Sequence, residues 1–409
     1  MLNEKGQREL VYVVRIDEIK PIEGKDRVEC AVVGGWTIMV RKGQFKPGDL
    51  GIYFEIDSKV PEKEPFMFLE GKHFKIKTQK YKTPSGHFWS QGLLMSAEDF
   101  GWYVNDERTA IIETNATNND GYHKLGDFLT KRLGVIYADA DDNKRKAKSA
   151  DKYKLMVQRR PDIFKKKWAQ WFMRRNWGKK VMFFFFGKKK DKKGGWPGHI
   201  ASKTDVERIQ NMIWILQDKK SFVATEKVDG SSFSVMAEQN KFRKIKKYIC
   251  SRNVVFDDPK AECYYDTNIY FEAYEKYNLG DKIEQMLKDL DLPNLAIQME
   301  IYGDGVQKRN YSLKDGERKI AVFHILSNNI KMPMDKVVEL CEKYDLPHVP
   351  IIDNNYILPD TIEELQTYVE SASSAIDGLE KEGIVFYDKE TGTQYFKFVS
   401  PSFLMKYHG

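Results

Sequence analysis

The stretch FVATEKVDGSSFSV, residues 222–235, places Lys227 between two runs of apolar and hydroxyl residues. Such runs predict strands, and Asp229-Gly230 between them is an ordinary turn signal, so a plain β-hairpin also explains the stretch. A K-x-D-G tetrapeptide occurs by chance in roughly one chain in ten of this length. The stretch gains meaning only if the rest of the chain supplies the partners that a reactive lysine needs.

The composition indicates a globular protein of more than one domain. A chain of 409 residues is too long for one ordinary domain, and 41% hydrophobic residues can build real cores. The four cysteines lie far apart without a C-x-x-C pair, which argues against a zinc site and suits a reducing compartment. The N-terminus, MLNEKGQREL, lacks the apolar core of a signal peptide, and no window approaches about 18 uninterrupted apolar residues. We therefore expect a cytoplasmic protein with no membrane span.

Charge is distributed unevenly along the chain. Residues 144–193 hold 20 Lys or Arg against three Asp, whereas the net charge of the whole chain is only +7. The remaining residues are therefore acidic on balance. A basic segment on an otherwise acidic protein points to a polyanionic partner.

The basic segment also contains a predicted helix. The run DIFKKKWAQWFMRRNWGKK, residues 162–180, puts Phe164, Trp168 and either Trp171 or Phe172 on one face. Three interpretations stay open: a helical strut with solvated charges, a membrane-surface helix, and an arm that contacts nucleic-acid phosphates. The arm would also use the lysines that follow it, Lys188, Lys189, Lys190, Lys192 and Lys193.

The parts of the chain on either side of this segment have different patterns. Residues 10–100 contain the β-rich runs LVYVVRIDEI, VECAVV, WTIMVRKG and DLGIYFEID, separated by turn signals. Strands at this spacing predict a small barrel or sandwich, with an OB-type barrel among the options. Beyond residue 200 the pattern is α+β, with the strands FVATEK, SFSVMA, AIQMEIYG, KIAVFHIL, GIVFY and QYFKFV.

Two capping boxes predict helices in this second half. Thr204 to Glu207 opens the first and Thr361 to Glu364 opens the second. The apolar face of the first helix is expected to consist of Ile209, Met212, Ile213 and Leu216.

Downstream of Lys227, residues with chemical potential lie on predicted strands or directly beside them. They are Ser251-Arg252-Asn253, Glu300 in QMEIYG, Phe323 in AVFHIL, Glu382 in EGIVFY and Lys397 in YFKFVS. Each of them alone is most often an ordinary core or surface residue. Together, one candidate nucleophile, two cations, two acids and an aromatic fit the covalent transfer of a nucleoside monophosphate to lysine.

The chemistry of that transfer requires these residue types. A lysine that attacks an α-phosphate must be neutral, although its ordinary pKa is near 10.4. Burial and nearby cations such as Lys397, Arg252 and a metal ion would lower that pKa and would neutralise charge on the phosphate. An aromatic can stack on the base, and Gly230 lets the backbone approach the ligand closely. The carboxylates that suit Mg²⁺ or Mn²⁺, directly or through waters, are Asp229, Glu300 and Glu382.

The order of these motifs resembles that of the covalent nucleotidyltransferases, which are the ATP-dependent ligases and the GTP-dependent mRNA capping enzymes. K-x-D-G, S-R-N, M-E-x-x-G, x-F-H-I, E-G-I-V and F-K-F-V-S look like their motifs I, Ia, III, IIIa, IV and V. The details resemble RNA ligases, in particular the Deinococcus-type and Naegleria-type branch with an N-terminal OB domain. The stretches that carry this likeness are RIDEIKPIEGKDRVECAVVGGW, VRKGQFKPGDLGIYFEIDS, SQGLL, SKTDVERIQN and FKFVSPSFL.

The resemblance covers nearly the whole chain and is weakest at residues 100–120 and in the basic segment. It implies an α+β protein with an antiparallel-sheet nucleotidyltransferase domain at residues 200–409. An OB-fold-like domain at residues 1–130 and a basic, aromatic-containing linker at residues 131–199 would precede it.

The resemblance also implies a role for each site residue. Lys227 would be the adenylylated nucleophile, Glu226 would read the adenine edge and Phe323 would stack on the ring. Glu300 would contact the ribose, and Arg252 and Lys397 would contact sugar or phosphate. The holders of metal-bound waters would be Asp229, Glu300 and Glu382, with Gly230 beside the nucleotide.

The last strand departs from the pattern of many related ligases. Those enzymes carry two lysines there as K-x-K, whereas this chain reads Tyr395-Phe396-Lys397-Phe398-Val399. Lys397 must therefore act alone, or Lys406 assists it.

The implied activity is that of an ATP-dependent RNA ligase. It would join 3′-OH and 5′-phosphate ends through a lysyl-AMP and an adenylylated polynucleotide, with Mg²⁺ or Mn²⁺. We expect a monomer that acts on nicked duplexes or broken RNA ends.

Two alternatives remain. The first is a DNA ligase or a capping guanylyltransferase, in which an OB domain usually follows the lysine domain; here the barrel-like half comes first. The second is a noncatalytic RNA-binding protein, which would leave Lys227 and its acids unexplained.

Overall fold

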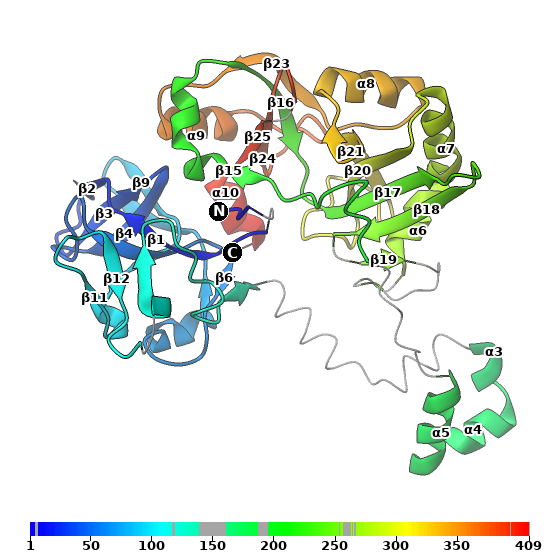
Figure 1. Ribbon diagram of the computed structural model, residues 1–409, viewed down its shortest axis with the longest axis horizontal. Coiled ribbons are helices and arrows are strands. Elements are labelled where there is room, and N and C mark those ends of the chain that lie inside the picture. The colour runs from blue at the N-terminus through cyan, green and yellow to red at the C-terminus, as the bar shows by residue number, and fades with distance from the viewer. Residues whose placement is uncertain are drawn as a thin grey trace.

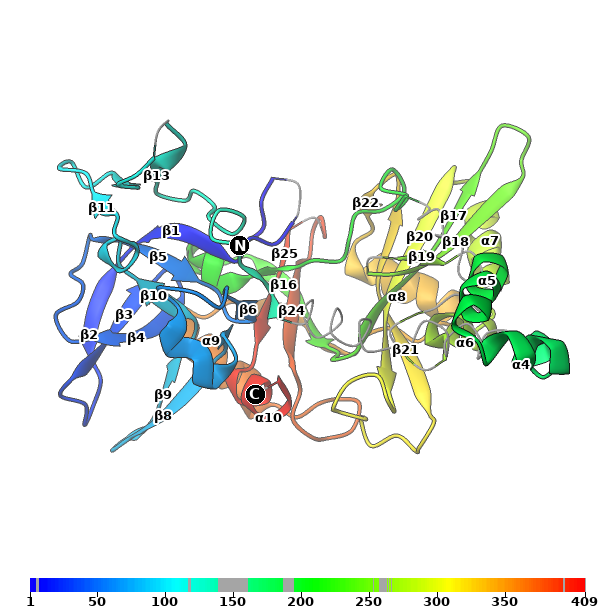
Figure 2. The same ribbon diagram turned by 90° about the horizontal axis from the view of Figure 1, so that it is seen from below.

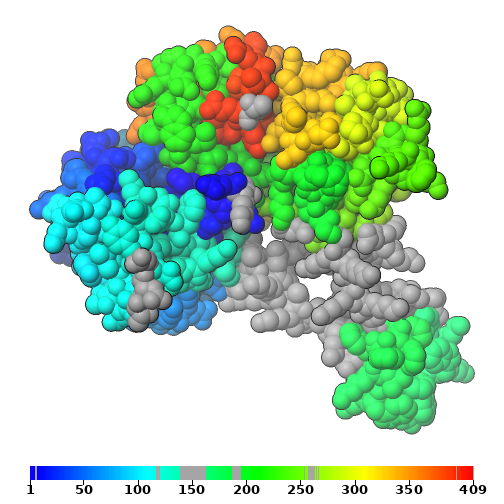
Figure 3. Space-filling view, in the orientation of Figure 1, coloured from blue at the N-terminus to red at the C-terminus, as the bar shows by residue number. Residues whose placement is uncertain are grey.

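The computed structural model describes residues 1–4, 7–116, 119–138, 161–186, 195–252, 254–256, 263, 265, 267–392 and 394–408. Its strands gather in an N-terminal region and a C-terminal region, which contact each other (Figures 1 and 3). In the described part of the chain, no helix combines the length and the apolarity needed to cross a membrane. All four cysteines are described, and none of them forms a disulfide.

The N-terminal region is built from short antiparallel strands. They are β1 (Val11–Arg15), β2 (Glu18–Pro21), β3 (Val28–Val33), β4 (Trp36–Arg41), β5 (Leu50–Phe54), β6 (Ser58–Lys59), β7 (Lys75–Ile76), β8 (Gln79–Thr83), β9 (Gly86–Ser90), β10 (Leu93–Met95), β11 (Tyr103–Val104), β12 (Ala110–Ile112), β13 (Tyr122–Lys124) and β14 (Ile136–Tyr137). The sheet orders are β1-β5-β10, β2-β3-β4, β14-β6-β7, β11-β12-β13 and β8-β9. Three 3₁₀ turns connect them: η1 (Met67–Lys72), η2 (Glu98–Phe100) and η3 (Asn119–Gly121).

Alternation along the strands positions this core. On β4, Trp36, Ile38 and Val40 are buried, whereas the residues between them are half-buried. Strand β1 is buried on both faces, because Val11 and Val13 join one apolar cluster and Tyr12 joins another. The strands predicted over residues 28–33 and 36–41 are confirmed.

The C-terminal region contains two larger sheets. The first has the order β15-β25-β24-β16-β23 and the second has the order β19-β18-β17-β20-β21-β22. Their strands are β15 (Glu207–Arg208), β16 (Ser221–Lys227), β17 (Ser231–Gln239), β18 (Ile245–Ser251), β19 (Val255–Phe256), β20 (Asn294–Gly303), β21 (Arg318–Ser327), β22 (Ile330–Lys331), β23 (Ile351–Ile357), β24 (Gly383–Asp388) and β25 (Tyr395–Val399). All pairings are antiparallel except β15 with β25, which are parallel.

Five helices accompany these sheets in the described part of the C-terminal region. They are α6 (Ile269–Lys276), α7 (Leu279–Asp289), α8 (Met334–Lys343), α9 (Ile362–Ser371) and α10 (Pro401–His408). Helix α7 contacts β17 and β20, α8 contacts β21, and α9 contacts β24 and β25. One core cluster joins the two sheets, with Val223 and Val385 from the first and Val235 and Ile297 from the second.

The prediction of a helix that begins at Thr204 is wrong. The chain forms β15 and then two 3₁₀ turns, η4 (Ile209–Asn211) and η5 (Ile213–Gln217). The reason is sheet pairing, since Glu207 and Arg208 lie in register with Phe396 and Lys397 of β25. The capping box at Thr361 is confirmed, because its hydroxyl accepts a hydrogen bond from the Glu364 amide at 3.2 Å.

The single helix predicted within residues 162–180 is also wrong. Three short helices stand there instead: α3 (Pro161–Phe164), α4 (Lys167–Met173) and α5 (Asn176–Phe186). The chain folds back on itself, which brings Phe164, Ala169 and Met182 into a small core. Residues 139–160 and 187–194, with Lys188, Lys189, Lys190, Lys192 and Lys193, lie outside the described residues.

The N-terminal and C-terminal regions meet at a polar interface. Arg8 donates to the carbonyl of Val206 at 3.1 Å, and Lys77 donates to the carbonyl of His408 at 2.6 Å. Helix α10 lies between the barrel and the two sheets (Figures 1 and 2). Its Leu404 packs against the barrel cluster that contains Trp36. The barrel therefore contacts the region that contains Lys227.

Candidate nucleotide-binding site

Lys227 is the last residue of β16, a central strand of the five-stranded sheet. The register places it opposite Gly383 of β24, so Glu382 directly precedes its neighbour. The Lys227 Nζ atom donates to Glu382 Oε2 at 2.6 Å, and the Lys227 side chain remains 24% exposed. The candidate nucleophile is thus fixed in position and accessible.

Two further carboxylates lie close to Lys227. Asp229 follows it in the loop after β16, and Glu300 lies on β20 of the second sheet, opposite Ser232. Burial raises the pKa of Glu300 to about 8; repulsion from Glu382 and Asp229 adds to the shift, and Lys227 opposes it. Burial likewise raises the pKa of Glu382. Burial and mutual repulsion therefore disfavour the simultaneous ionisation of Glu300 and Glu382.

The carboxylates control the protonation of Lys227. Burial alone would lower its pKa, but attraction to Glu382, Glu300 and Asp229 outweighs burial and raises the pKa above its ordinary value. We expected burial, Lys397, Arg252 and a metal ion together to lower the pKa of Lys227. Lys397 does repel Lys227, but among the protein's own groups the three carboxylates prevail and the net shift is upward.

Lys397 lies among cations instead. It lies on β25, beside Arg208 of the parallel strand β15. Burial, followed by repulsion from Arg8, Arg208 and Lys227, lowers the pKa of Lys397 well below its ordinary value. Arg208 is itself buried and pairs with Asp57 of the barrel at 3.1 Å. Such a concentration of positive charge suits a polyphosphate.

Arg8 and Arg208 were not identified from the sequence. Arg208 lies inside the quoted stretch SKTDVERIQN, but the expected helix obscured its position next to Lys397. Arg8 had no local signal, because only the contact between the two regions brings it to this site.

Asp229 is held by two residues that the sequence analysis did not select. Its backbone N–H donates to the hydroxyl of Tyr311 at 2.5 Å, and His408 Nε2 lies 3.4 Å from its Oδ1 atom. The contact with Asp229 raises the pKa of His408. The second carboxylate oxygen, Oδ2, is buried and has no hydrogen-bond partner among the described residues.

Glu226 is fully buried on the strand that carries Lys227. Ser374 Oγ donates to Oε1 at 2.5 Å, and the Ala375 N–H donates to Oε2 at 2.7 Å. Burial raises the pKa of Glu226. The loop between α9 and β24 therefore anchors this carboxylate, and its role toward adenine stays a prediction.

Gly230 and Phe323 flank the same site. A Cβ atom at Gly230 would clash with the Ile301 carbonyl oxygen and lie 2.8 Å from Glu300 Cγ, so only glycine lets the two strands approach this closely. Phe323, on β21, is half-buried and packs against the cluster that contains Val228.

Arg252 is the outermost of the predicted residues. It follows β18, pairs with Asp205 and remains 43% exposed, and its charge favours the ionised form of Glu300. The neighbouring Asn253 lies outside the described residues.

The carboxylates fit a divalent cation by their chemistry. Among the described residues, the buried Asp229 Oδ2 atom has no hydrogen-bond partner. Burial and the neighbouring carboxylates raise the pKa of Glu300, so a nearby cation would stabilise its charged form. Across the described residues, no group of three or more His, Cys, Asp or Glu is arranged to ligate a metal ion directly. The fit is thus to an ion that also binds waters or phosphate oxygens.

Comparison with known proteins identifies two segments. Residues 10–96 match the model of an OB-fold domain, and residues 220–408 match the model of the RNA ligase family. No curated protein matches the chain.

Solved structures resemble nearly the whole chain. A structure of Naegleria gruberi RNA ligase with PPi has a TM-score of 0.67 at 24% identity, over 98% of this chain and 99% of that chain. A lysine mutant of the same ligase with ATP and Mn gives 0.66 at 24% identity, over 98% of each chain. These matches confirm the predicted fold, an OB-fold domain followed by a nucleotidyltransferase domain with antiparallel sheets.

Proposed function

We propose that this chain, whose residues 220–408 belong to the RNA ligase family, is an ATP-dependent RNA ligase that joins 3′-OH and 5′-phosphate ends. The observation that supports this best is the position of Lys227. Its amine lies 2.6 Å from Glu382, its side chain is partly exposed, and its charge interacts with Glu300 and Asp229 and with the cation Lys397. A noncatalytic RNA-binding protein would not need this arrangement.

The first step transfers AMP to Lys227. The amine attacks the α-phosphorus of ATP, a nitrogen–phosphorus bond forms, and the bond to pyrophosphate breaks. In the second step a 5′-phosphate oxygen of the RNA takes the AMP, and the lysine is released. In the third step the 3′-OH attacks the activated 5′-phosphate and AMP leaves.

Lys227 must lose its proton before it attacks. The structure holds it charged, because its carboxylate neighbours raise its pKa. Asp229, Glu300 and Glu382 would hold Mg²⁺ or Mn²⁺ through its bound waters, and the ion would neutralise these carboxylates and the phosphate oxygens. With the carboxylates neutralised, the pKa of Lys227 falls and the amine loses its proton to water.

The other site residues orient the nucleotide. Lys397 and Arg252 contact phosphate or sugar, and Glu300 contacts the ribose. Glu226 reads the adenine edge, and Phe323 stacks on the ring. The position of Phe323 beside the Lys227 loop supports its role. Lys397 needs no second lysine on its strand, because Arg208 and Arg8 supply additional positive charge.

We propose that the polynucleotide substrate is RNA with nicks or broken ends. We also propose that the protein acts as a monomer in the cytoplasm. The similar structures support ATP and a divalent metal as cofactors, since they contain Naegleria gruberi RNA ligase with ATP and Mn, with AMP and Mn, and with PPi.

Covalent labelling tests the proposal. The protein is incubated with α-³²P ATP or α-³²P GTP and a divalent metal, and then separated by denaturing electrophoresis. Label from ATP, followed by sealing of nicked duplexes that contain RNA, is the expected result. Label from GTP would indicate a guanylyltransferase, and an unlabelled protein would overturn the proposal.

A further inference from the structure

The helices α3, α4 and α5 form a small unit with its own apolar core. Phe164, Ala169 and Met182 are buried in it, and Phe172 and Phe186 pack against them. The unit lies between the two segments that match family models, residues 10–96 and 220–408. Neither the OB-fold domain nor the nucleotidyltransferase domain accounts for it.

The surface of the unit displays aromatic rings. Phe184 is 82% exposed and Phe185 is 69% exposed, and about half of each of Trp168, Trp171 and Trp177 is exposed. Isolated exposed aromatics are ordinary, but five within 26 residues are not. The tryptophans are held by edge contacts, with centroids 6.0 Å apart for Trp171 and Trp177, so the rings are fixed while part of their surface stays open.

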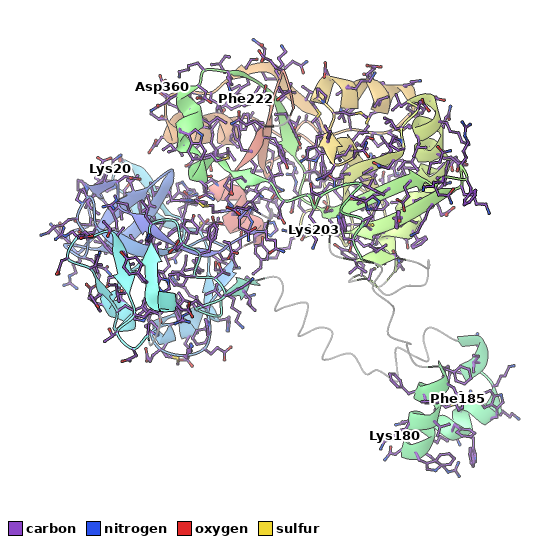
Figure 4. The ribbon with its side chains drawn as sticks, in the orientation of Figure 1. Lys20, Lys180, Phe185, Lys203, Phe222 and Asp360 are labelled. Atoms are coloured by element: carbon purple, nitrogen blue, oxygen red, sulfur yellow. The ribbon has the colours of Figure 1, made fainter. Side chains whose placement is uncertain are left out.

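Cations are interleaved with these rings. The only acid within residues 161–186 is Asp162, against seven Lys or Arg. The Arg175 guanidinium lies 3.8 Å from the Trp171 ring centroid, and Lys165, Lys166 and Lys167 directly precede Trp168. Lys180 and Phe185 both lie on this helix unit (Figure 4), and both are exposed. The surface therefore combines positive charge with stacking faces.

This combination favours single-stranded nucleic acid as the occupant. Unpaired bases stack on aromatic side chains, while cations beside them contact the phosphates. An interfacial membrane helix instead separates an apolar face from a basic one. Here Arg175 covers an aromatic ring, so the two kinds of residue share one surface. A solvated strut would need the charges but not the rings.

We propose that α3–α5 bind unpaired RNA beside the break, with Phe184, Phe185 and the tryptophans stacking on bases. This inference rests on the proposed function, because RNA ends are the substrate only if the chain is an RNA ligase. The cations Lys165, Lys166, Lys167, Arg174, Arg175 and Lys180 contact the phosphates. The unit thereby raises affinity for substrates with single-stranded flanks without reading sequence.

Fluorescence anisotropy of the full-length protein with labelled single-stranded RNA tests the stacking. The double variant Phe184→Ser, Phe185→Ser is expected to bind roughly a hundredfold more weakly, since the loss of each stacking ring costs on the order of tenfold. Both side chains are so exposed that the change leaves the small core intact. The matched control is Phe242→Ser, which removes an 84% exposed phenylalanine between Lys241 and Arg243 on the β17–β18 hairpin. Unchanged affinity in the double variant, or an equal loss in the control, would overturn the inference.

A second variant tests the charges. Replacement of Lys165, Lys166 and Lys167 by serine should reduce the slope of log K against log salt by about 0.7 per lost phosphate contact, roughly 2 in total. An unchanged slope would contradict the phosphate contacts. Vesicles of equal parts phosphatidylcholine and phosphatidylserine provide the competing partner. The inference would be overturned if the wild-type protein bound these vesicles but not RNA, and if the double variant lost the vesicle binding. The surface would then bind lipid.

The same preparations separate this inference from the proposed function. If the wild-type protein takes no label from ATP, the ligase proposal fails. If it is labelled by ATP but the helix variants bind RNA as tightly as wild type, only the proposal for α3–α5 fails.

Discussion

The Lys227 amine and the Glu382 carboxylate are 2.6 Å apart, and sheet register causes their proximity. Because Lys227 ends β16 opposite Gly383, the residue before β24 must lie next to the lysine. The pair places a nucleophile at the end of β16 beside an acid that directly precedes the neighbouring strand β24. Its strength also means that the lysine becomes reactive only when the ion pair is broken.

Lys227→Ala should abolish covalent labelling by α-³²P ATP, because no other amine occupies this place. Lys227→Arg should fail as well, since a guanidinium cannot be deprotonated in a protein. Both variants are measured by denaturing electrophoresis after incubation with divalent metal.

Lys331→Gln is the matched control. Burial lowers the pKa of Lys331 to about 8, so it is the more readily deprotonated of the two amines. It nevertheless lies on β22, at the edge of the other sheet, and the variant should retain labelling. Label that persists in Lys227→Ala, or disappears only in Lys331→Gln, would contradict the assignment of the nucleophile.

Gly230→Ala should lower the rate of lysyl-AMP formation by about a hundredfold, as a misplacement near 1 Å commonly does. The added methyl group would clash with the Ile301 carbonyl and press on Glu300, which displaces the Lys227–Asp229 loop. Single-turnover labelling measures the rate. Gly71→Ala, in η1, where no atom lies within 4 Å of the added Cβ and the backbone is not left-handed, is the control for effects of substitution alone. Labelling at the wild-type rate in Gly230→Ala would show that the close approach is unnecessary.

The strands of the fold were predictable because their signals are local. Alternation and β-branched runs identify β3, β4, β16 and β24 from the sequence alone. The segment after Thr204 was not predictable in this way, since a helical pattern of apolar residues was overridden by pairing with β25. In segments as short as this one, tertiary contacts decide the secondary structure.

The candidate site likewise contains residues that the sequence predicts and residues that it does not. Lys227, Asp229, Glu300 and Glu382 belong to motifs that are visible in sequence order, and the structure brings them together. The partners Tyr311 and His408 lie in a loop and in the last helix, where spacing gives no signal. The raised pKa of Lys227 was also beyond the sequence, because it depends on which charges lie nearest.

Glu55→Gln should destabilise the protein by about 3–5 kcal/mol at neutral pH, as expected when a buried ion pair loses one partner. Glu55 is fully buried, pairs with Arg8 at 3.2 Å, contacts the Met1 amine and accepts a hydrogen bond from Asn211 across the interface at 2.9 Å. Glu62→Gln, which removes an exposed partner 3.6 Å from Lys59, is the control and should cost at most about 1 kcal/mol.

The pH dependence of this effect has a definite sign. Burial alone would raise the pKa of Glu55, but the Met1 amine, Arg8 and Arg208 outweigh it and lower the pKa to about 2. The stabilisation is therefore fully present above the ordinary pKa of glutamate and is lost as the pH falls through about 2. Urea unfolding at a series of pH values should show the gap between wild type and Glu55→Gln narrowing below pH 4.5. A gap that stays constant on acidification would refute the role of the Glu55 charge.

A truncated chain that begins at Gly195 should still be labelled by ATP at Lys227. Its nick-sealing activity should fall further below that of the full chain than its labelling does. Ser202 would be a poor starting point, because Ile200 and Ala201 are buried against the second sheet and Trp196 donates to the Ala201 carbonyl at 2.7 Å. Adenylylation needs only the nucleotide, which the two sheets would hold. Sealing also needs the duplex beside the nick, and we propose that the N-terminal barrel binds that duplex.

The residual adenylylation of this truncated chain should be below that of the full chain. Truncation removes Arg8, which lowers the pKa of Lys397, and Asp57, which pairs with buried Arg208 at 3.1 Å. The full-length variant Asp57→Asn separates the two effects, since it weakens the Arg208 contact while the barrel stays attached. Its sealing of nicked RNA-containing duplexes should remain well above that of the truncated chain. If the truncated chain seals nicks at the full-length rate, the barrel has no role in gripping the duplex.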